Sequence, residues 1–396
     1  MKILHVLTDM LTDSGSPALS VCGMAEAVAA REHEVSIVCL KREGTAIQPQ
    51  GVLVRGFAAD RQSARMASAD LRAYLQQNVR HFDVVHIHGL WQSPAHYAAT
   101  AARQSKIPYI LAPHGQLESG VPKNGGRLKQ SINWLLRDSA ILHHAAAIQC
   151  LNISEMKHSP ALQGQKNTII GNGIPASVCE NLPARGSWRH EIQSTLGQLD
   201  RPLALFLGRI DPKSGLERLL PHWPAILKTH PDVLLVIAGT GDKPYIDTLN
   251  NLIDKHHLTG HIVWTGELTG LAKWRTLVDS DVFILPAHQA NTSPAIIEAM
   301  AAGLPVVLTR ECHFDEVEEH HAGVIIEHGD MSAFATSVSE LLGNHEILSS
   351  MGQNAQNLVQ THFTWEVTGE KLERLYESLA LHTDIPLDLL PPRDNP

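Results

Sequence analysis

Residues 285–307 of this 396-residue chain read LPAHQANTSPAIIEAMAAGLPVV, a pattern typical of a strand, a loop and a helix. The strand ends at Pro286, and Ser293 followed by Pro294 is typical of a helix cap and first helical turn. The free N–H groups and the dipole at such a helix start favour an anion such as a phosphate. Glu298 lies about one turn into the helix, where its carboxylate could accept two hydrogen bonds from a ribose diol. The alternative is an ordinary crossover helix whose glutamate is solvated.

Short apolar runs alternate with helix-like stretches on both sides of this segment. In the first half we expect strands at 3–8, 35–40, 84–88, 109–112 and 147–150, and helices at 18–31, 63–80, 94–103 and 128–136. In the second half we expect strands at 203–207, 233–238, 261–264, 282–285 and 306–308, and helices at 215–228, 245–256, 272–279, 295–302 and 365–381. Such alternation is typical of α/β domains whose parallel sheets are covered on both faces.

A segment rich in glycine and proline, residues 169–188, interrupts the alternation and is interpreted as a linker between two doubly wound α/β domains. We expect an N-terminal domain at 1–180, a C-terminal domain at 181–363 and a loose tail at 382–396. Ligands of such sheets bind beyond the C-terminal ends of the strands, so the cleft between the two domains is the expected site.

The composition excludes several classes of protein. The formal net charge of −9 argues against a nucleic-acid-binding protein, because such a protein needs a basic surface. Residues 1–180 carry 17 basic and 13 acidic side chains and residues 181–396 carry 15 and 28, so only the first domain could favour an anionic surface. No apolar run reaches the roughly 18 residues of a membrane span, and the apolar start MKILHVL is too short for a signal sequence. The five scattered cysteines predict neither a disulfide framework nor a metal-binding pair and favour a cytoplasmic setting.

The segment around Glu298 resembles the signature of glycosyltransferase family 4, in which a second glutamate precedes Ala-Met-Ala-x-Gly-x-Pro-Val-Val. The similarity continues along nearly the whole chain, at 84–89 (VVHIHG), 112–115 (APHG), 207–210 (LGRI), 237–242 (IAGTGD), 263–266 (VWTG) and 363–366 (FTWE). It implies the GT-B fold, in which two Rossmann-like domains face a central cleft and a last helix, about 364–381, crosses back to the first domain. It also implies retaining transfer of a sugar from a nucleoside diphosphate sugar. Because bacterial exopolysaccharide and lipopolysaccharide glycosyltransferases are similar, the expected acceptor is a glycan or a lipid-linked sugar.

The resemblance further implies roles for individual residues. Arg209 would act at the donor diphosphate, Glu298 at the ribose and His114 at the donor sugar, and these three form the expected catalytic set. Donor binding would also involve Gly15, Ser16, Lys213, Gly239, Gly241, Thr292, Ser293, Pro294 and Ala295, and Glu118 would bind the acceptor. No metal or other cofactor is expected, because Arg209 and the helix dipole would stabilise the leaving phosphate, which itself acts as the base. Without the resemblance, His114 is equally a satisfied histidine in a turn and Glu118 a solvated surface residue.

Three positions depart from the family pattern. The first glutamate of the signature falls at Ala290, which cannot bind the hydroxyls of the donor sugar. The lysine that accompanies the arginine falls at Ser214, one residue after Lys213, and the second glycine of the first-domain loop is Ser16. Loss of one such cation costs on the order of 2–4 kcal/mol of transition-state stabilisation. A second hypothesis is therefore a pseudoenzyme that binds a nucleotide or a partner without transfer, and a third is a nucleotide-sugar epimerase of the same fold.

Two other groups of residues admit a function. Basic and apolar side chains at 123–137 resemble an amphipathic helix on an anionic membrane, which predicts a peripheral contact with the cytoplasmic face of the inner membrane. The alternative for this segment is a core-facing helix with solvated basic residues. His86 and His88 lie on one face of a strand at a spacing that a metal could use, but no third ligand is evident, so we expect no metal site there.

Overall fold

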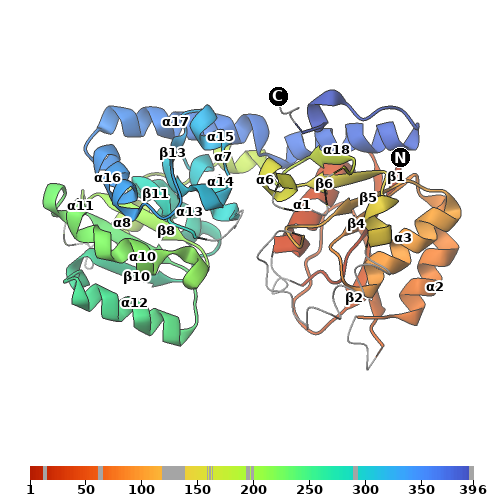
Figure 1. Ribbon diagram of the computed structural model, residues 1–396, viewed down its shortest axis with the longest axis horizontal. Coiled ribbons are helices and arrows are strands. Elements are labelled where there is room, and N and C mark those ends of the chain that lie inside the picture. Colours follow the sequence, from red (N-terminus) through yellow and green to blue (C-terminus); the bar gives the residue numbers. More distant parts are fainter. Residues whose placement is uncertain are drawn as a thin grey trace. The chain divides into compact units, whose positions relative to one another are not determined.

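The computed structural model describes residues 1–396 except 12–15, 61–65, 118–138, 158, 160–161, 163, 193–196, 198–199, 289–292 and 392–396. The chain forms two compact units (Figure 1). The first comprises Met1–Gly173 and Trp365–Pro396, and the second comprises Ile174–Thr364. Each unit has its own parallel sheet between helices, so the predicted α/β class with parallel sheets is confirmed. The first unit extends to Gly173, and the second begins at Ile174, whose N–H donates to the Phe363 carbonyl.

The first unit is built on a 7-stranded sheet of order β3-β2-β1-β4-β5-β6-β7, in which every pair is parallel. Its strands are β1 (Lys2–Val6), β2 (Glu34–Lys41), β3 (Leu53–Ala58), β4 (Val84–His88), β5 (Tyr109–Ala112), β6 (Ala147–Cys150) and β7 (Asn167–Ile169). Its helices are α1 (Ser16–Ala29), α2 (Ala69–Asn78), η2 (Val79–His81), α3 (Ser93–Ser105), α5 (Ser139–His143), α6 (Ile153–Lys157), α18 (Trp365–Ala380) and η9 (Leu387–Leu389). The strand order reverses between β1 and β4, as in a doubly wound sheet.

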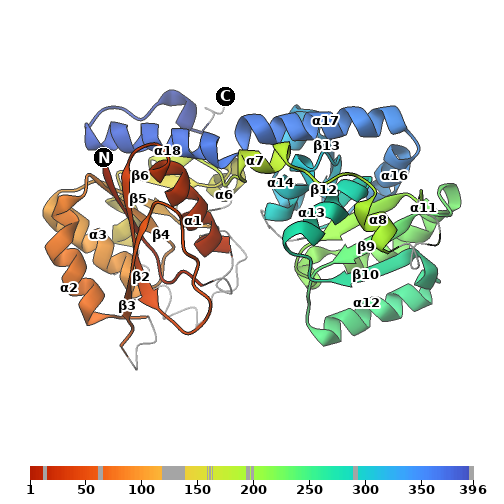
Figure 2. The ribbon, with the colours of Figure 1, turned by 180° about the vertical axis from the view of Figure 1, so that it is seen from behind.

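Different helices cover the two faces of this sheet. On one face, Leu71 and Leu75 of α2 pack with Leu4 of β1. On the other face, α1 and α18 contribute to a core that includes Leu372. Helix α18 follows the second unit in sequence but packs against α1 (Figure 2). Glycine at position 23 permits this approach, since a Cβ there would lie within the Trp365 ring.

The second unit is built on a 6-stranded parallel sheet of order β10-β9-β8-β11-β12-β13. Its strands are β8 (Leu203–Leu207), β9 (Leu234–Ala238), β10 (Ile262–Gly266), β11 (Val282–Leu285), β12 (Val306–Thr309) and β13 (Gly323–Ile326). Its α-helices are α7 (Ala176–Glu180), α8 (Ser187–Glu191), α10 (Leu216–Leu219), α11 (Trp223–Thr229), α12 (Lys243–Lys255), α13 (Gly270–Asp279), α14 (Pro294–Ala301), α15 (Glu316–Glu319), α16 (Met331–Leu342) and α17 (His345–His362). Short 3₁₀ helices are η5 (Pro212–Ser214), η6 (Leu220–His222), η7 (Thr259–His261) and η8 (Arg310–Cys312).

Several expected elements differ from the structure. The helix expected at 63–80 begins only at Ala69, because Ser68 is extended and its hydroxyl accepts from the Leu71 N–H. The helix expected at 215–228 is divided into α10, η6 and α11, and Pro221 and Pro224 each remove a helical N–H donor there. Among the elements that were not predicted are the edge strands β3, β7 and β13 and the helices α16 and α17. The helix expected at 128–136 lies outside the described residues.

All five cysteines are buried in the structure. Within the part of the chain that the structure describes, no helix has both the length and the apolar composition to cross a membrane.

Candidate functional site

The start of α14 has the geometry of a capped helix. Ser293 has extended backbone angles, and its Oγ accepts a hydrogen bond from the Ala295 N–H at 3.3 Å. Pro294 is the first helical residue, and at this position the absence of an N–H leaves no helical carbonyl without its donor. The remaining N–H groups of the first turn and the helix dipole make this end of α14 favourable for an anion.

Glu298 forms an ion pair that the sequence did not predict. Its Oε1 lies 2.6 Å from Nζ of Lys273 on α13. The two side chains are only 18% and 22% exposed, so the contact is partly shielded from water. The Lys273 ammonium also lies 5.5 Å from the centre of the Trp274 ring. No motif marks Lys273, because its proximity to Glu298 depends on the packing of α13 against α14.

A pocket of about 410 Å³ lies at the C-terminal ends of β8, β9 and β10. Arg209 and Glu267 are among its lining residues. The Arg209 side chain is 76% exposed and lies 3.8 Å from the Asp211 carboxylate, so its guanidinium is accessible to a ligand. This is the sheet edge at which doubly wound folds bind their ligands.

Gly239 and Gly241 also line this pocket, and packing alone requires both of them. Gly239 has φ +143°, and a Cβ there would lie 1.8 Å from the Gly208 carbonyl oxygen. A Cβ at Gly241 would lie 2.1 Å from the Ile210 carbonyl oxygen. The backbones of the loops after β8 and β9 are therefore in contact. This packing accounts for both glycines without a bound sugar nucleotide.

The loop of residues 211–215 contains Ser214, where the family pattern has a lysine, and its neighbour Lys213. Ser214 is 6% exposed and turned into the protein, whereas its neighbour Lys213 is exposed. The Asp211 carboxylate accepts from the Lys213 N–H at 2.9 Å and so caps η5. Gly215 has φ +74°, and a Cβ there would lie 1.8 Å from the Pro286 carbonyl oxygen. The cation of this loop is therefore at position 213, beside the segment that leads to α14.

In the first unit, His114 follows β5 in a left-handed backbone conformation, with φ +52°. The next two residues fix this loop. The Gly115 N–H donates to the Glu155 carboxylate at 2.5 Å, and the Leu90 N–H donates to Gln116 Oε1 at 2.7 Å. Burial lowers the pKa of His114 to about 4, so its ring is neutral at pH 7 and offers one donor and one acceptor. Neither Glu155 nor Gln116 was predicted, because both act on backbone that is remote in sequence.

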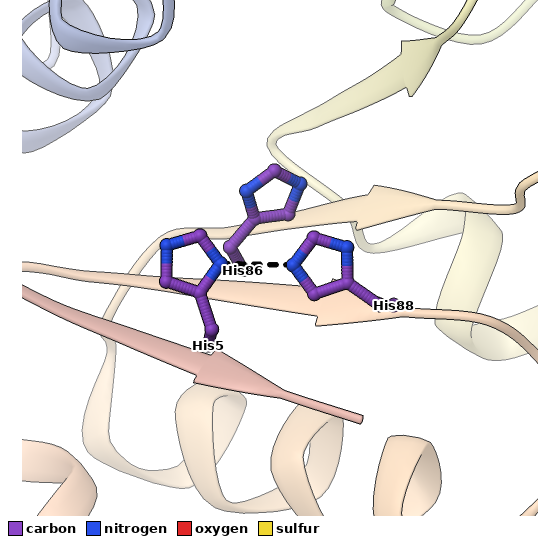
Figure 3. A group of neighbouring side chains, drawn as sticks. All are labelled: His5, His86 and His88. Atoms are coloured by element: carbon purple, nitrogen blue, oxygen red, sulfur yellow. Dashed lines mark hydrogen bonds between the residues drawn. The ribbon is translucent and has the colours of Figure 1, made fainter. Parts of the chain in front are cut away.

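His86 and His88 have the third neighbour that the sequence did not reveal, which is His5 (Figure 3). One nitrogen of each ring lies within 4.8 Å of the others, and His5 Nδ1 is 2.9 Å from His88 Nε2. Parallel pairing of β1 with β4 sets His5 opposite His86. Burial holds the pKa of each ring below its usual range, so all three are neutral. We refer to His5, His86 and His88 as the histidine row.

Several predicted residues lie outside the described part of the chain. These are Gly15, Glu118, Ala290 and Thr292, together with the basic segment 123–137, and the side chain of Ser16 is likewise not described. Of the predicted residues of the second unit that the structure describes, Arg209, Gly239 and Gly241 line one pocket. Lys213 belongs to η5, and Ser293, Pro294, Ala295 and Glu298 belong to the start of α14 and its first turns.

Two family profiles match the chain. One, described as "Glycosyl transferase 4-like domain", matches residues 15–173, and the other, described as "Glycosyl transferases group 1", matches residues 189–358. Spore coat protein SA of Bacillus subtilis is 30% identical over 200 residues, which are 48% of this chain and 52% of that protein. The GDP-mannose-dependent alpha-(1-6)-phosphatidylinositol monomannoside mannosyltransferase of Mycolicibacterium smegmatis is 26% identical over 195 residues, which are 47% and 50% of the two chains. The chain thus spans about half the length of these curated relatives.

Among solved structures, HepE of Anabaena in complex with UDP matches with a TM-score of 0.74. The match covers 96% of this chain and 100% of that one, at 16% sequence identity. Similarity at this level of identity shows that the two chains share a fold.

Proposed function

Because this chain belongs to the glycosyltransferases of the GT4 type, which have the GT-B fold, we propose that it transfers a sugar from a nucleoside diphosphate sugar to an acceptor hydroxyl. One observation carries the proposal, the contact between two loops at one edge of the second sheet. Gly215 packs directly on the Pro286 carbonyl, and the His288 N–H donates to the Lys213 carbonyl at 3.1 Å. The loop with Arg209 and Lys213 therefore lies against the segment that leads to α14, and both cations belong to the edge that has the capped helix start.

In the proposed reaction the bond between the anomeric carbon and the diphosphate oxygen breaks, and the electron pair goes to the diphosphate. Arg209 and Lys213 stabilise this developing charge together with the N–H groups of α14. A phosphate oxygen of the leaving group takes the proton of the acceptor hydroxyl as the new bond forms on the same face of the sugar, so the configuration is retained. No metal is needed in this scheme, and we expect EDTA to leave the rate unchanged.

We further propose a glycan or lipid-linked acceptor in the synthesis of a surface polysaccharide. The support is the sequence resemblance and the name of the mycobacterial relative, which specifies a phosphatidylinositol mannoside acceptor. The basic segment 123–137 supports a contact with an anionic membrane on its cytoplasmic side. Replacement of Lys123, Arg127 and Lys129 by alanine should then shift the protein from the membrane fraction to the supernatant. Equal fractionation of the two proteins would remove the membrane contact from the proposal.

A second candidate function is nucleotide binding without transfer. Two observations favour it: the inward orientation of Ser214, and the ion pair that occupies Glu298 Oε1. Under this alternative the second unit retains affinity for a nucleoside diphosphate, but the sugar stays attached to it.

The test is to incubate the full chain with UDP-sugars and GDP-sugars and to follow release of the nucleoside diphosphate. We expect release with at least one donor and slower release in Glu298→Ala. The matched control is Glu340→Ala, since Glu340 is an exposed residue of α16. A thermal shift with a nucleotide but no release would favour the binding protein. If no donor produces a thermal shift and none releases its nucleoside diphosphate, both candidate functions are contradicted.

A further inference from the structure

The histidine row lies inside the first unit, on the face of the sheet that α1 and α18 cover. His5 of β1 lies opposite His86 of β4 in the parallel register, and His88 follows two residues later on the same face. His5 and His86 are fully buried and His88 is 5% exposed. Polar rings in such a position destabilise the fold unless their nitrogens are hydrogen-bonded. Their hydrogen bonds therefore indicate what the row does.

Two hydrogen bonds join His5 and His88 to His114 in a chain. His5 Nδ1 lies 2.9 Å from His88 Nε2, and His88 Nδ1 lies 3.1 Å from His114 Nε2. His86 stands beside this chain, with its Nδ1 2.8 Å from the Tyr376 hydroxyl. The chain thus runs from the interior of the sheet to the half-buried residue that follows β5.

The protons of this chain have only two possible arrangements. Burial lowers the pKa of His5 to about 3 and that of His114 to about 4, and it holds the pKa of His88 well below its usual range. Each ring is therefore neutral at pH 7 and has one N–H and one bare nitrogen. With one proton on each ring, there are two possibilities. In the outward direction His5 donates to His88 and His88 donates to His114. In the inward direction His114 donates to His88 and His88 donates to His5.

The buried end of the chain favours the outward direction. His5 Nε2 is buried and has no hydrogen-bond partner among the described residues. In the inward direction this atom carries an N–H without an acceptor, whereas in the outward direction it is a bare acceptor. Orphaned N–H groups are rarer in proteins than under-satisfied acceptors. His5 therefore donates to His88, and the His88 Nδ1–H donates to His114 Nε2.

We propose that His5 and His88 are positioning residues that hold His114 in the tautomer with its proton on Nδ1. Resting on the proposed function, this assigns the His114 Nδ1–H as the donor of a hydrogen bond to a hydroxyl oxygen of a sugar substrate. A donor fixed in advance loses no binding energy to a change of tautomer when the sugar arrives.

A metal ion bound to the histidine row would be coordinated by ring nitrogens that take part in the hydrogen-bonded chain. His5, His86 and His88 contain no carboxylate or thiolate, so a divalent ion bound by them alone would leave two uncompensated charges inside the sheet. Both nitrogens of His88 are also engaged already, one with His5 and one with His114. The contacts therefore fit a hydrogen-bonded chain better than a metal centre.

The test compares His88→Asn with His88→Leu in the full chain. The asparagine amide can replace the Nδ1–H donor toward His114, whereas leucine has a similar size and no donor. Tyr376→Phe is the matched control, because it removes a hydrogen bond to His86 in the same row and leaves the chain intact. The readouts are ¹⁵N NMR of labelled histidine rings, with the His114 signals assigned through His114→Gln, and kcat and KM for nucleotide release.

We expect the Nδ1–H tautomer of His114 in the unmodified protein, in Tyr376→Phe and in His88→Asn, and mixed tautomers in His88→Leu. In His88→Leu, kcat/KM for the sugar nucleotide should fall by about 10- to 100-fold, and His88→Asn should restore part of the loss. If His88→Leu does not fold, His5→Leu removes the donor at the buried end and should give the same mixture.

A proton on Nε2 of His114 in the unmodified protein overturns the inference. So does stoichiometric metal in the purified protein that is lost when His88 is replaced by asparagine. If His114 has its proton on Nδ1 but the protein releases no nucleoside diphosphate from any sugar nucleotide, the tautomer is supported and the proposed function is contradicted.

Discussion

The candidate ligand-binding groups of the second unit are charged and largely accessible, whereas those of the first unit are neutral and mostly buried. Arg209 is 76% exposed, and its neighbour Lys213 is also exposed. By contrast, His5 is fully buried, His88 is 5% exposed, and His88 hydrogen-bonds to the half-buried His114. The difference indicates two kinds of recognition, of an anion by cations and of hydroxyl groups by neutral donors. Added salt should weaken the binding of an anion, and acid should weaken the binding of hydroxyl groups.

The largest expected effect is a loss of stability of the first unit in acid. Burial lowers the pKa of His5 to about 3, whereas an unfolded histidine titrates near 6.5. Between these values the unfolded chain binds protons that the folded ring excludes, so stability is full above about pH 6.5 and falls as the pH is lowered toward 3. From pH 7 to pH 5 this costs about 1–2 kcal/mol for His5, and His86 and His88, whose pKa values burial also lowers, add to the loss.

Hydrogen exchange of peptides from β1 and β4, compared with peptides from β8 and β9, measures this loss within one molecule. We expect protection to fall first in β1 and β4, and a His86→Phe variant to lose part of the pH dependence. Equal loss of protection in both units at the same pH would contradict the comparison.

Replacement of Arg209 should give the next largest effect. Arg209→Ala removes a cation from the proposed diphosphate site, so we expect nucleotide release to slow by about 10²- to 10³-fold, and added salt to slow the unmodified protein more than the variant. Arg185→Ala is the matched control, since Arg185 is an exposed arginine of the same unit that pairs with Asp281, before the start of β11. Equal rates for Arg209→Ala and Arg185→Ala would exclude Arg209 from the site.

The ion pair between Lys273 and Glu298 should produce a smaller effect. Glu298→Ala should raise the Kd for the nucleotide by about 10- to 100-fold, because hydrogen bonds to a charged acceptor contribute about 1.5–3 kcal/mol. Lys273→Met keeps the carboxylate but releases it from its partner, so we expect a rise in Kd below that of Glu298→Ala. Calorimetric titration with UDP and GDP measures both values, and a Lys273→Met variant that binds more weakly than Glu298→Ala would show that the lysine itself contacts the nucleotide.

The smallest expected effect concerns the glycines of the pocket. Gly241→Ala places a Cβ 2.1 Å from the Ile210 carbonyl oxygen, so the loops after β8 and β9 must separate. We expect a loss of about 1–3 kcal/mol in the free energy of unfolding, measured by urea denaturation. Gly260→Ala is the control, because a Cβ there has no neighbour within 4 Å. An unchanged stability of Gly241→Ala would mean that packing does not require this glycine.

Local patterns in the sequence predicted the central strands of both units and several of their helices. The 3.6-residue spacing, Ser293 and Pro294 located α14, and the apolar runs located the central strands. The ion pair of Glu298 could not be predicted, because Lys273 belongs to another helix and only packing brings the two together. Likewise, the register in which β1 pairs with β4 brings His5 opposite His86, and this register cannot be read from a single sequence. The edge strand β3 was missed because its side chains are half exposed and its apolar pattern is weak.

The position of α18 in the sequence determines when the first unit can be completed during synthesis. Residues 365–380 supply Leu372, Leu375 and Tyr376 to the core of a sheet whose strands all precede residue 170. On the ribosome, the α18-covered face of that sheet therefore stays open to water while the entire second unit is translated. His86 lacks the Tyr376 hydroxyl throughout this interval. The unit that is translated first is thus finished last, and its nascent form is the one that needs protection from aggregation.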